Sequence, residues 1–477
     1  MKSSRQLPPS PTQTAINDQV FDIVVVGAGV VGCAVARRFV LEGATVAVVE
    51  KATDILDGAS KANSAILHTG FDAPPESLEL SCIRDGYREY TEIHTEMGLP
   101  LENTGAHMVA WNDEEAAKLE AIVKQAHANG VEDVKRIEVK GLFRREPRLS
   151  KNAAAAIFVP GESIIDPWSA PYAYLRQALM NGGQIFLSCE VTGGDFDGSE
   201  WHLETSGGTL KSRHVINCAG LYGDRLDTAL LGTTEFNITP RKGQFIIFDK
   251  AASALVNSII LPVPTSRTKG VVVCRTVFGN VLVGPTAEDQ ESRSDTSTDE
   301  AALNALISSG VEKFPDLEGM PITAVYAGLR PASEYKDYQI EAKPDLGWIT
   351  VGGIRSTGLS SALGIARHVY ELYTEQGPKH SAIAKPSVPQ AVVLAQKGDR
   401  DWRCKDHGEI VCHCELVTSR EINQALTGPL GARSLSGLKR QTRATMGRCQ
   451  GFYCSARLTE LTEGHFKTPP SDEISHG

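Results

Sequence analysis

The sequence predicts an α/β fold with two parts. A Rossmann-like dinucleotide-binding domain, with an interleaved α+β substrate domain on a mixed sheet, precedes a small helical C-terminal domain. Three observations lead to this prediction. Apolar runs of strand character alternate with helical patterns over most of the chain. A glycine-rich turn joins the first strand pattern to the first helical pattern. Five of the 10 cysteines lie beyond residue 403, which sets the C-terminal segment apart.

The composition is that of an ordinary globular protein with more than one domain. The chain has 477 residues, of which 41% are apolar and 22% are charged, which argues against a disordered or fibrous chain. The 48 basic and 58 acidic residues give a net charge of −10. This balance argues against a protein that binds nucleic acid or an anionic membrane through bulk charge.

The N-terminal residues and the longest apolar stretch bear on location. Met1–Gln19 has no apolar core, so we interpret it as a flexible tail rather than a secretory signal. The stretch Ile23–Ala36 contains three glycines and is too short for a transmembrane helix. We therefore expect a cytoplasmic protein, either free or in peripheral contact with the inner face of the membrane. In that reducing compartment a group of thiols binds metal or performs redox chemistry.

The strand and helix patterns alternate along the chain. Strands are predicted at Ile23–Val26, Thr45–Val49, Gln184–Leu187, His214–Cys218, Gln244–Asp249, Gly270–Arg275, Asn280–Val283 and Gly347–Val351. Helices are predicted at Val31–Leu41, Leu78–Met97, Asp113–Asn129, Trp168–Met180, Glu300–Lys313 and Ser360–Glu375. A linker-like stretch with three prolines follows from Gln376 to about Arg403.

The glycine-rich turn has the features of a dinucleotide site. In the run Gly27-Ala-Gly29-Val-Val-Gly32, Gly27 permits the tight turn, Gly29 admits a pyrophosphate, and Gly32 lets the helix pack closely on the strand. The next strand ends at Glu50, 18 residues after Gly32. A carboxylate there accepts hydrogen bonds from ribose hydroxyls and repels a 2′-phosphate. The full strand–turn–helix–strand–Glu context favours a bound dinucleotide over a plain glycine-rich turn.

Two later segments favour FAD over a nicotinamide cofactor. The run Val215–Asp224, which contains Ala219 and Gly220, is a strand that leads into a turn of small residues. The run Gly347–Ala362 is another strand and glycine turn, followed by a helix whose N-terminus can stabilise the anionic reduced flavin. The sequence contains one dinucleotide fingerprint and no second one for a separate nicotinamide domain.

In order and spacing, these segments resemble the D-amino-acid-oxidase-like FAD-dependent oxidoreductases over about Phe21–Tyr373. Further stretches resemble the FAD-dependent glycerol-3-phosphate dehydrogenases and oxidases: Ala62–Asp72, Lys269–Val271, Gly279–Glu288, Asp295–Thr298 and Ala327–Pro331. The related 2-hydroxyglutarate oxidases share the pattern Asn63-Ser64-x-x-x-His68, so that segment alone does not choose the substrate. The resemblance implies an FAD site made by Gly27, Gly29, Gly32, Glu50, Asn63, Ser64, Val191, Ala219, Gly220, Gly353, Ser356, Gly358 and Leu359.

The resemblance also implies a reaction, the oxidation of sn-glycerol 3-phosphate to dihydroxyacetone phosphate, with electrons passed to a quinone or a carrier protein. His68 is the candidate base, because the pKa of an unperturbed imidazole suits proton abstraction near neutrality. Arg330 and Lys269 are the candidate clamp for the substrate anion. The alternatives are a structural histidine and two solvated cations.

One departure from the family pattern bears on the substrate. The turn reads Ser356-Thr357-Gly358, where many relatives have Ser-Pro-Gly. Another polyol phosphate, a 2-hydroxy acid such as 2-hydroxyglutarate, or an amino acid therefore stays open as the substrate.

The C-terminal cysteines form two close pairs, Cys412-x-Cys414 and Cys449-x₄-Cys454, which can bring four thiolates to one centre. Zinc commonly takes four cysteines, but Cys-x-Cys is an unusual zinc half-site, and iron–sulfur clusters accept varied spacings. The segment resembles the bacterioferritin-associated-ferredoxin-like (BFD-like) [2Fe–2S] domain, including the form at the C-terminus of anaerobic glycerol-3-phosphate dehydrogenases. The resemblance implies a [2Fe–2S] cluster on these four cysteines, with zinc as the alternative. Cys33, Cys82, Cys189, Cys218 and Cys274 are interpreted as core residues.

The motifs together predict the domain bounds. We expect a tail over residues 1–20, a flavoprotein over 21–376, a linker over 377–403, a [2Fe–2S] domain over 404–460 and a tail over 461–477. Within the flavoprotein we expect FAD-binding parts at about 21–100, 150–235 and 340–376, and substrate parts at about 101–149 and 236–339.

Overall fold

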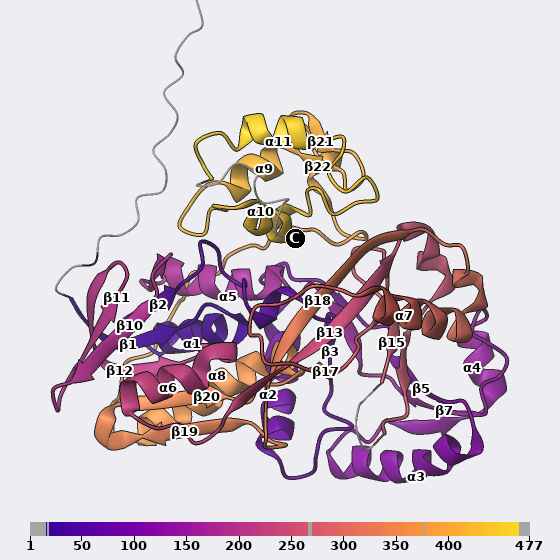
Figure 1. Cartoon of the computed structure of the whole chain (residues 1–477), viewed down its shortest axis with the longest axis horizontal. Coiled ribbons are helices and arrows are strands. Elements are labelled where there is room, and N and C mark those ends of the chain that lie inside the picture. Colours follow the sequence, from indigo (N-terminus) through magenta and orange to yellow (C-terminus); the bar gives the residue numbers. More distant parts are fainter. Residues whose placement is uncertain (1–15, 17–18, 266–269, 376, 467–477) are drawn as a thin grey trace, which may run out of the picture.

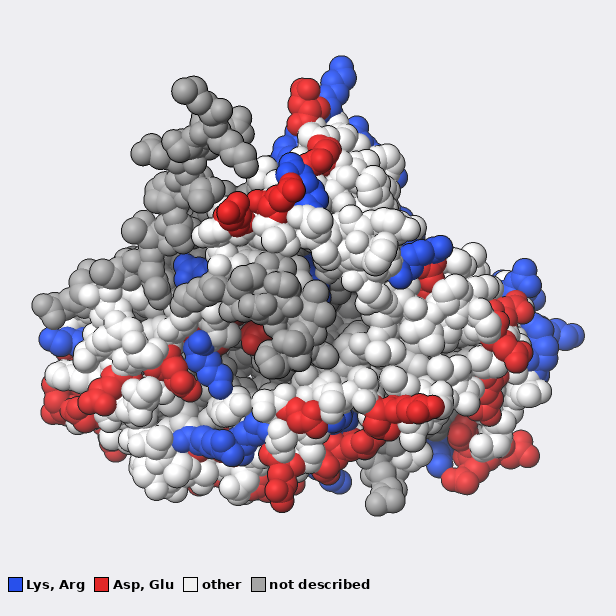
Figure 2. Space-filling view, turned by 45° about the horizontal axis from the view of Figure 1, so that its top comes forward, with Lys and Arg blue, Asp and Glu red and all other residues white. Residues whose placement is uncertain are grey.

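The structure is a computed structural model that describes residue 16 and residues 19–265, 270–375 and 377–466. Its body holds two large sheets side by side, and a small C-terminal unit lies on top of them (Figure 1). Acidic and basic side chains are interspersed over the face in Figure 2, without a field of one sign.

The first sheet has a parallel centre with an antiparallel margin. Its strands are β1 (Val20–Val26), β2 (Val46–Glu50), β9 (Gln184–Leu187), β10 (Val191–Phe196), β11 (Trp201–Thr205), β12 (Gly208–Asn217), β19 (Gln339–Lys343) and β20 (Trp348–Gly352). The order is β10-β11-β12-β1-β2-β9, with β20 parallel to the end of β12 and β19 antiparallel to β20. β1 and β2 are almost wholly apolar because both faces of this sheet are covered.

Helices cover one face of this sheet, and a mixed layer covers the other. The helices of the body that pack around it are α1 (Val30–Leu41), α2 (Leu78–Ile93), α5 (Ser169–Met180), α6 (Gly223–Leu231) and α8 (Gly358–Glu375). Phe39 of α1 and Tyr373 of α8 lie in the core beneath one face. Trp201 of β11 and Trp348 of β20 pack on the other, together with α6. This layering places the C-terminal ends of β1 and β2 at a common edge, where α/β proteins bind nucleotides.

The second sheet is mostly antiparallel and carries the substrate-side strands. Its members are β5 (Ala106–Ala110), β6 (Lys135–Ile137), β7 (Ala155–Val159), β13 (Ile238–Phe248), β14 (Ile259–Pro262), β15 (Val272–Arg275), β16 (Val281–Gly284), β17 (Glu288–Asp289) and β18 (Ile322–Ser333). The order is β17-β13-β16-β15-β14-β5-β7-β6, and β18 runs antiparallel along β13. Helices α3 (Asp113–Ala128), α4 (Val139–Arg145) and α7 (Glu300–Lys313) flank this sheet (Figure 1).

Short elements join these parts. A three-stranded sheet consists of β3 (Ile66–Leu67), β8 (Ser163–Ile165) and β4 (Leu101–Glu102). The short 3-10 helices are η1 (Ala59–Lys61), η2 (Gly220–Tyr222), η3 (Lys250–Leu255), η4 (Pro315–Leu317), η5 (Pro344–Leu346) and η6 (Asp401–Arg403). No helix among the described ranges is long and apolar enough to cross a membrane.

The C-terminal unit has its own small core. It contains β21 (Ile410–Cys412), β22 (Val417–Thr418), α9 (Ser419–Ala425), α10 (Leu435–Thr442) and α11 (Ser455–Leu461), which pack around Ile422, Leu438 and Leu458. A reciprocal capping box between Thr418 and Glu421 starts α9. We call this unit, residues 404–466, the C-terminal module.

The module is attached to the body by specific polar contacts. The carboxylate of Asp54, in the loop after β2, accepts hydrogen bonds from the Arg433 amide at 3.0 Å and the Ser434 hydroxyl at 2.7 Å, at the start of α10. Arg448 pairs with Asp249 at 2.6 Å. The stretch before the module lies along the body and buries Leu394 and Ala395. The domain bounds themselves stay a sequence-based prediction.

Every strand and helix predicted from the sequence is present, with ends that differ by a few residues. The pattern missed β14, β18, β19, the hairpin of β10 and β11, the strands β5 to β7, of which only β6 lies at the sheet edge, and the helices α4 and α6. β18 contains Pro331, which usually argues against a central strand. Here Pro331 stands opposite Pro240 of β13, so neither residue is required to donate a ladder hydrogen bond to the other.

Candidate functional site

A cavity of about 800 Å³ lies between the C-terminal ends of the first sheet and the β13–β18 ribbon. Residues predicted for the site from distant parts of the chain meet at its wall: Gly27, Gly29, Glu50, Asn63, Ser64, Val191, Ala219, Gly220, Arg330, Ser356, Gly358 and Leu359. Gly32, Gly353 and His68 do not line this cavity. Lys269 lies outside the described residues. The cavity therefore unites most of the nucleotide predictions with one of the three substrate predictions, Arg330.

The glycine turn is shaped for close backbone approach. Gly27 has φ of +104°, and a Cβ there would lie 2.6 Å from the carbonyl oxygen of Cys218. A Cβ on Gly32 would lie 1.9 Å from the carbonyl oxygen of Gly27, so Gly32 serves helix packing and does not need to reach the cavity. α1 begins at Val30, whose amide donates to Ser60 Oγ at 3.0 Å. The turn and the helix N-terminus together form a cradle for a diphosphate.

Glu50 ends β2 at the cavity wall. Its carboxylate accepts hydrogen bonds from the amides of Ala28 at 2.8 Å and Ala52 at 2.9 Å. Burial raises the pKa of Glu50, and the two amide hydrogen bonds act in the opposite direction. Each oxygen keeps a second lone pair, so the residue fits the ribose-binding role of a dinucleotide site.

Arg330 lies across β13, and backbone carbonyls fix its orientation. Its Nη2 donates to the carbonyl oxygens of Thr286 at 2.6 Å and Lys242 at 3.2 Å, and its Nε donates to that of Arg241. A Cβ on Gly243 would lie 2.8 Å from Nη2, so this position has room only for glycine. Burial, and then the nearby Arg241, lower the pKa of Arg330 to about 10. The group stays cationic at neutral pH and fits a ligand anion.

His68 follows β3, where antiparallel pairing with β8 brings it next to Glu162. Its Nδ1 lies 2.7 Å from Glu162 Oε2, and the exposed fraction of its side chain is 25%. Its backbone amide donates to Ser360 Oγ at 2.9 Å. Ser360 comes directly after the cavity-lining Gly358 and Leu359, so the loop with His68 adjoins the cavity wall without being part of it.

Sequence reasoning missed several polar residues of the site. Glu162 carries no local signal, because it reaches His68 across 94 residues through strand pairing. Ser60 and Lys61, in η1, line the cavity, and so do Arg293 and Arg355. Ser60 and Lys61 lie just before the Asn63-Ser64 motif. Their proximity to that motif is the sequence feature that could have pointed to them as site residues. Arg293 is paired with Asp224 and Arg355 with Glu79, so Lys61 and Arg330 are the cations of this group that suit the cavity for an anionic ligand.

The four predicted cysteine ligands come together as two pairs in the module. The thiols of Cys412 and Cys454 form one hydrogen-bonded pair, and those of Cys414 and Cys449 form the other. The hydrogen bond with Cys454 lowers the pKa of Cys412 to about 6. The amide of Tyr453 lowers the pKa of Cys449. The hydrogen bond with Cys412 raises the pKa of Cys454, and burial raises that of Cys414, so one thiol of each pair is favoured as the thiolate that metals bind.

The pairing of the thiols bears on the choice of metal centre. A Cβ on Gly447 would lie 2.2 Å from the Cβ of Cys414, so this glycine lets the two ligand loops approach. Two cysteine pairs fit the two irons of a [2Fe–2S] cluster, because each iron can take one pair as ligands.

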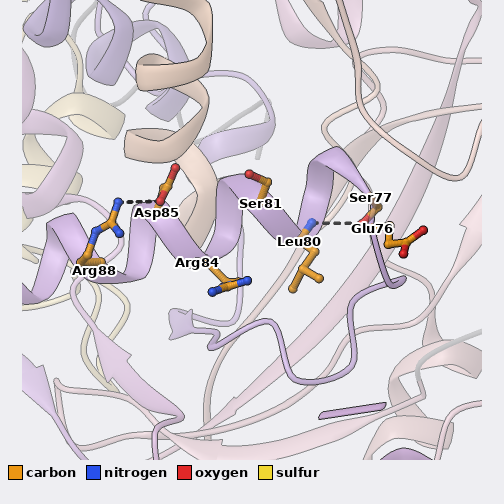
Figure 3. A pocket seen from close by; sticks show the side chains of 7 residues that line it. All are labelled: Glu76, Ser77, Leu80, Ser81, Arg84, Asp85 and Arg88. Atoms are coloured by element: carbon orange, nitrogen blue, oxygen red, sulfur yellow. Dashed lines mark hydrogen bonds and ion pairs between the residues drawn. The ribbon is translucent and has the colours of Figure 1, made fainter. Parts of the chain in front are cut away.

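A second hollow lies on the exposed side of α2 and contains no predicted site residue. It is lined by Glu76, Ser77, Leu80, Ser81, Arg84, Asp85 and Arg88, all from α2 or the turn before it (Figure 3). Arg88 pairs with Asp85 at 2.6 Å, and Ser77 caps the helix through the amide of Leu80. These polar groups therefore stabilise α2 itself. We assign the candidate functional site to the first cavity.

The chain belongs to the FAD dependent oxidoreductase (DAO) family, whose model matches residues 22–372. Residues 410–463 match the BFD-like [2Fe-2S] binding domain. These matches confirm the predicted family, the mixed α/β fold with a C-terminal iron–sulfur domain, and the cofactors FAD and [2Fe–2S].

Individual relatives extend this result. The chain is 34% identical to a glycerol 3-phosphate dehydrogenase of Caloramator mitchellensis, over 93% of this chain and 94% of the relative. It is 28% identical to the mitochondrial L-2-hydroxyglutarate dehydrogenase of Homo sapiens, over 62% of this chain and 67% of that one. The FAD-bound structure of L-alpha-glycerophosphate oxidase from Mycoplasma pneumoniae aligns with a TM-score of 0.71 and 27% identity, over 77% and 97% of the two chains.

Proposed function

We propose that the protein oxidises sn-glycerol 3-phosphate to dihydroxyacetone phosphate and passes the electrons to a quinone or a carrier protein. The observation that carries the proposal is the half-buried Arg330, a cation at the cavity wall whose Nε and Nη2 hydrogens are taken by backbone carbonyls. Support comes from the Caloramator relative, which covers both the oxidoreductase and the iron–sulfur parts of this chain.

Each group of residues in the site would have its own role in the reaction. The glycine turn, Glu50 and the N-terminus of α8 would hold FAD, which supplies a hydride acceptor when bound. Arg330 would bind the phosphate through its Nη1 hydrogens. His68 would take the hydroxyl proton at Nε2 while the carbinol hydrogen leaves as hydride. The substrate thereby loses two electrons and two hydrogens and becomes a ketone. The clamp role of Lys269 stays a sequence-based prediction.

The iron–sulfur module favours a dehydrogenase over an oxidase. We place the four cysteines as ligands of a cluster that relays single electrons from the flavin to the acceptor. We expect the acceptor to meet the protein in the cytoplasm or at the inner face of the membrane, through a partner subunit or a peripheral contact. A second candidate substrate is a 2-hydroxy acid, which the similarity to L-2-hydroxyglutarate dehydrogenases favours.

Anaerobic bleaching of the flavin absorbance tests the proposal. We expect glycerol 3-phosphate to bleach the holoenzyme faster than 2-hydroxyglutarate, other polyol phosphates or amino acids. His68→Asn and Arg330→Ala should suppress bleaching while FAD is retained. Arg241→Ala is the matched control, because Arg241 stands opposite Arg330 in the ladder but does not line the cavity. Faster bleaching by another substrate, or wild-type rates in both variants, would contradict the assignment.

The acceptor preference needs a separate measurement. We expect turnover with an artificial one-electron acceptor to exceed hydrogen peroxide formation in air. Stoichiometric peroxide formation without activity on artificial acceptors would identify an oxidase instead.

A further inference from the structure

Glu162 is a buried carboxylate that contacts the candidate base. Its side chain has an exposed fraction of 0%, and its Oε2 lies 2.7 Å from Nδ1 of His68. Its Oε1 accepts hydrogen bonds from the Thr69 amide at 2.7 Å and the Thr69 hydroxyl at 2.9 Å. No Lys or Arg of the described residues pairs with it within ion-pair distance. Burying a carboxylate costs free energy unless hydrogen-bond donors replace the water that it loses. The three donors to Glu162 provide this replacement as long as they stay in place.

The backbone around Glu162 is fixed from several sides. The Gly105 amide donates to the Glu162 carbonyl oxygen at 2.9 Å, and the Tyr87 hydroxyl donates to the Gly161 carbonyl oxygen at the same distance. A Cβ on Gly161 would lie 2.7 Å from Cγ2 of Thr69, so a larger residue would push the turn away from His68. The carboxylate therefore occupies one position relative to the imidazole ring.

This arrangement selects a tautomer. An ionised carboxylate only accepts hydrogen bonds, so its 2.7 Å contact requires the proton on Nδ1 of His68. A neutral imidazole then carries its lone pair on Nε2, the nitrogen that can take a proton from an alcohol. We propose that Glu162 is a positioning residue that holds His68 as the Nδ1–H tautomer and orients Nε2 for proton abstraction. The inference rests on the proposed function, because it assigns His68 as the base of that reaction.

Glu162→Gln tests this role, because glutamine keeps the shape but adds an amide that can donate to Nδ1 and so favour the other tautomer. We expect kcat of the holoenzyme with glycerol 3-phosphate to fall by about 10²-fold or more, the scale of general-base catalysis, with little change in KM. Nitrogen NMR of histidine-labelled oxidised enzyme should show His68, assigned by its loss in His68→Asn, changing from the Nδ1–H to the Nε2–H form.

Glu146→Gln is the matched control. Glu146 is also fully buried and accepts two amides and a hydroxyl, from Asn257 and Ser258, far from the candidate base in the sequence and outside the cavity. We expect this variant to keep both kcat and the His68 tautomer, whatever it costs in stability. A loss of kcat in both variants to the same extent would assign a purely structural role to Glu162.

The outcomes separate the two proposals. Wild-type kcat with an unchanged tautomer in Glu162→Gln, while His68→Asn is inactive, would overturn the positioning role alone. Wild-type turnover in His68→Asn would overturn the proposed base. If Glu162→Gln does not fold, the wild-type spectrum decides, because an Nε2–H or doubly protonated His68 at neutral pH contradicts the inference.

Discussion

The guanidinium carbon of Arg443 lies 3.9 Å from the centre of the Phe278 ring, which joins the C-terminal module to the body. Phe278 stacks on Trp168 with ring centres 5.6 Å apart. The Trp168 indole donates to the carbonyl oxygen of Lys61 at 3.1 Å, and Lys61 lines the cavity. A continuous series of contacts therefore runs from the module to the wall of the flavin cavity.

Arg443→Met should lower the thermal stability of the C-terminal module. Arg443 pairs with the buried Glu415 at 2.9 Å, and Lys250 of the body pairs with the same carboxylate at 3.1 Å. Removing one partner of a buried ion pair lowers the free energy of unfolding by about 3 kcal/mol or more. We expect a smaller loss here, because Lys250 still pairs with Glu415. We expect the cluster absorbance to melt at a lower temperature than the flavin signal. The control Arg457→Met removes only exposed pairs with Glu409 and Glu460 and should melt as the wild type does.

Gly243→Ala should displace Arg330 without a change in charge. The added Cβ would lie 2.8 Å from Arg330 Nη2 and 2.9 Å from Pro285 Cβ. Because small displacements of a binding group are costly, we expect kcat/KM for glycerol 3-phosphate to fall by about tenfold or more, with FAD retained. Gly141→Ala is the control, since its Cβ meets only the end of the Arg144 side chain at 3.8 Å. An equal fall in both variants would argue against the Arg330 site.

The buried His107 should make the free energy of unfolding depend on pH. It is buried against Ser258, and burial, followed by Arg145, lowers its pKa from 6.5 to about 4. The unfolded chain therefore binds the proton first as the pH falls. Stability that is present above pH 6.5 is lost between pH 6.5 and about 4. The shift corresponds to about 3 kcal/mol.

The measurement is the thermal midpoint of unfolding across this pH range. His107→Gln should flatten the profile, even if it lowers the midpoint at every pH. The control is His202→Gln, at a half-exposed histidine, which should leave the profile as in the wild type. An unchanged slope in His107→Gln would show that other groups determine the acid sensitivity.

Cys449→Ser should remove the cluster without removing flavin chemistry. We expect iron and sulfide to be lost together with the cluster spectrum, while substrate still bleaches the flavin, because the cavity lies in the body. Cys404→Ser is the control, since Cys404 is exposed and lies outside the two thiol pairs. Metal analysis of the wild type should give two irons per chain; one zinc per chain would instead support zinc, the alternative to the cluster.

Local sequence patterns determined much of this protein. The strand–turn–helix at Gly27 to Gly32, the acid at Glu50 and the close cysteine pairs act through neighbouring residues, so their chemistry can be read from spacing. The alternation of apolar runs likewise placed the central strands and major helices. The strands that the pattern missed, such as β6 and β18, depend on pairing with neighbouring strands more than on a signal in their own residues.

The tertiary structure alone decided how the groups face one another. The register of β3 and β8 brings Glu162 to His68, and the register of β13 and β18 lays Arg330 over Gly243. The docking of the module on Asp54 and Asp249 also joins residues that are far apart in the chain. Such contacts depend on strand pairing and packing between distant segments, and no local pattern carries that information.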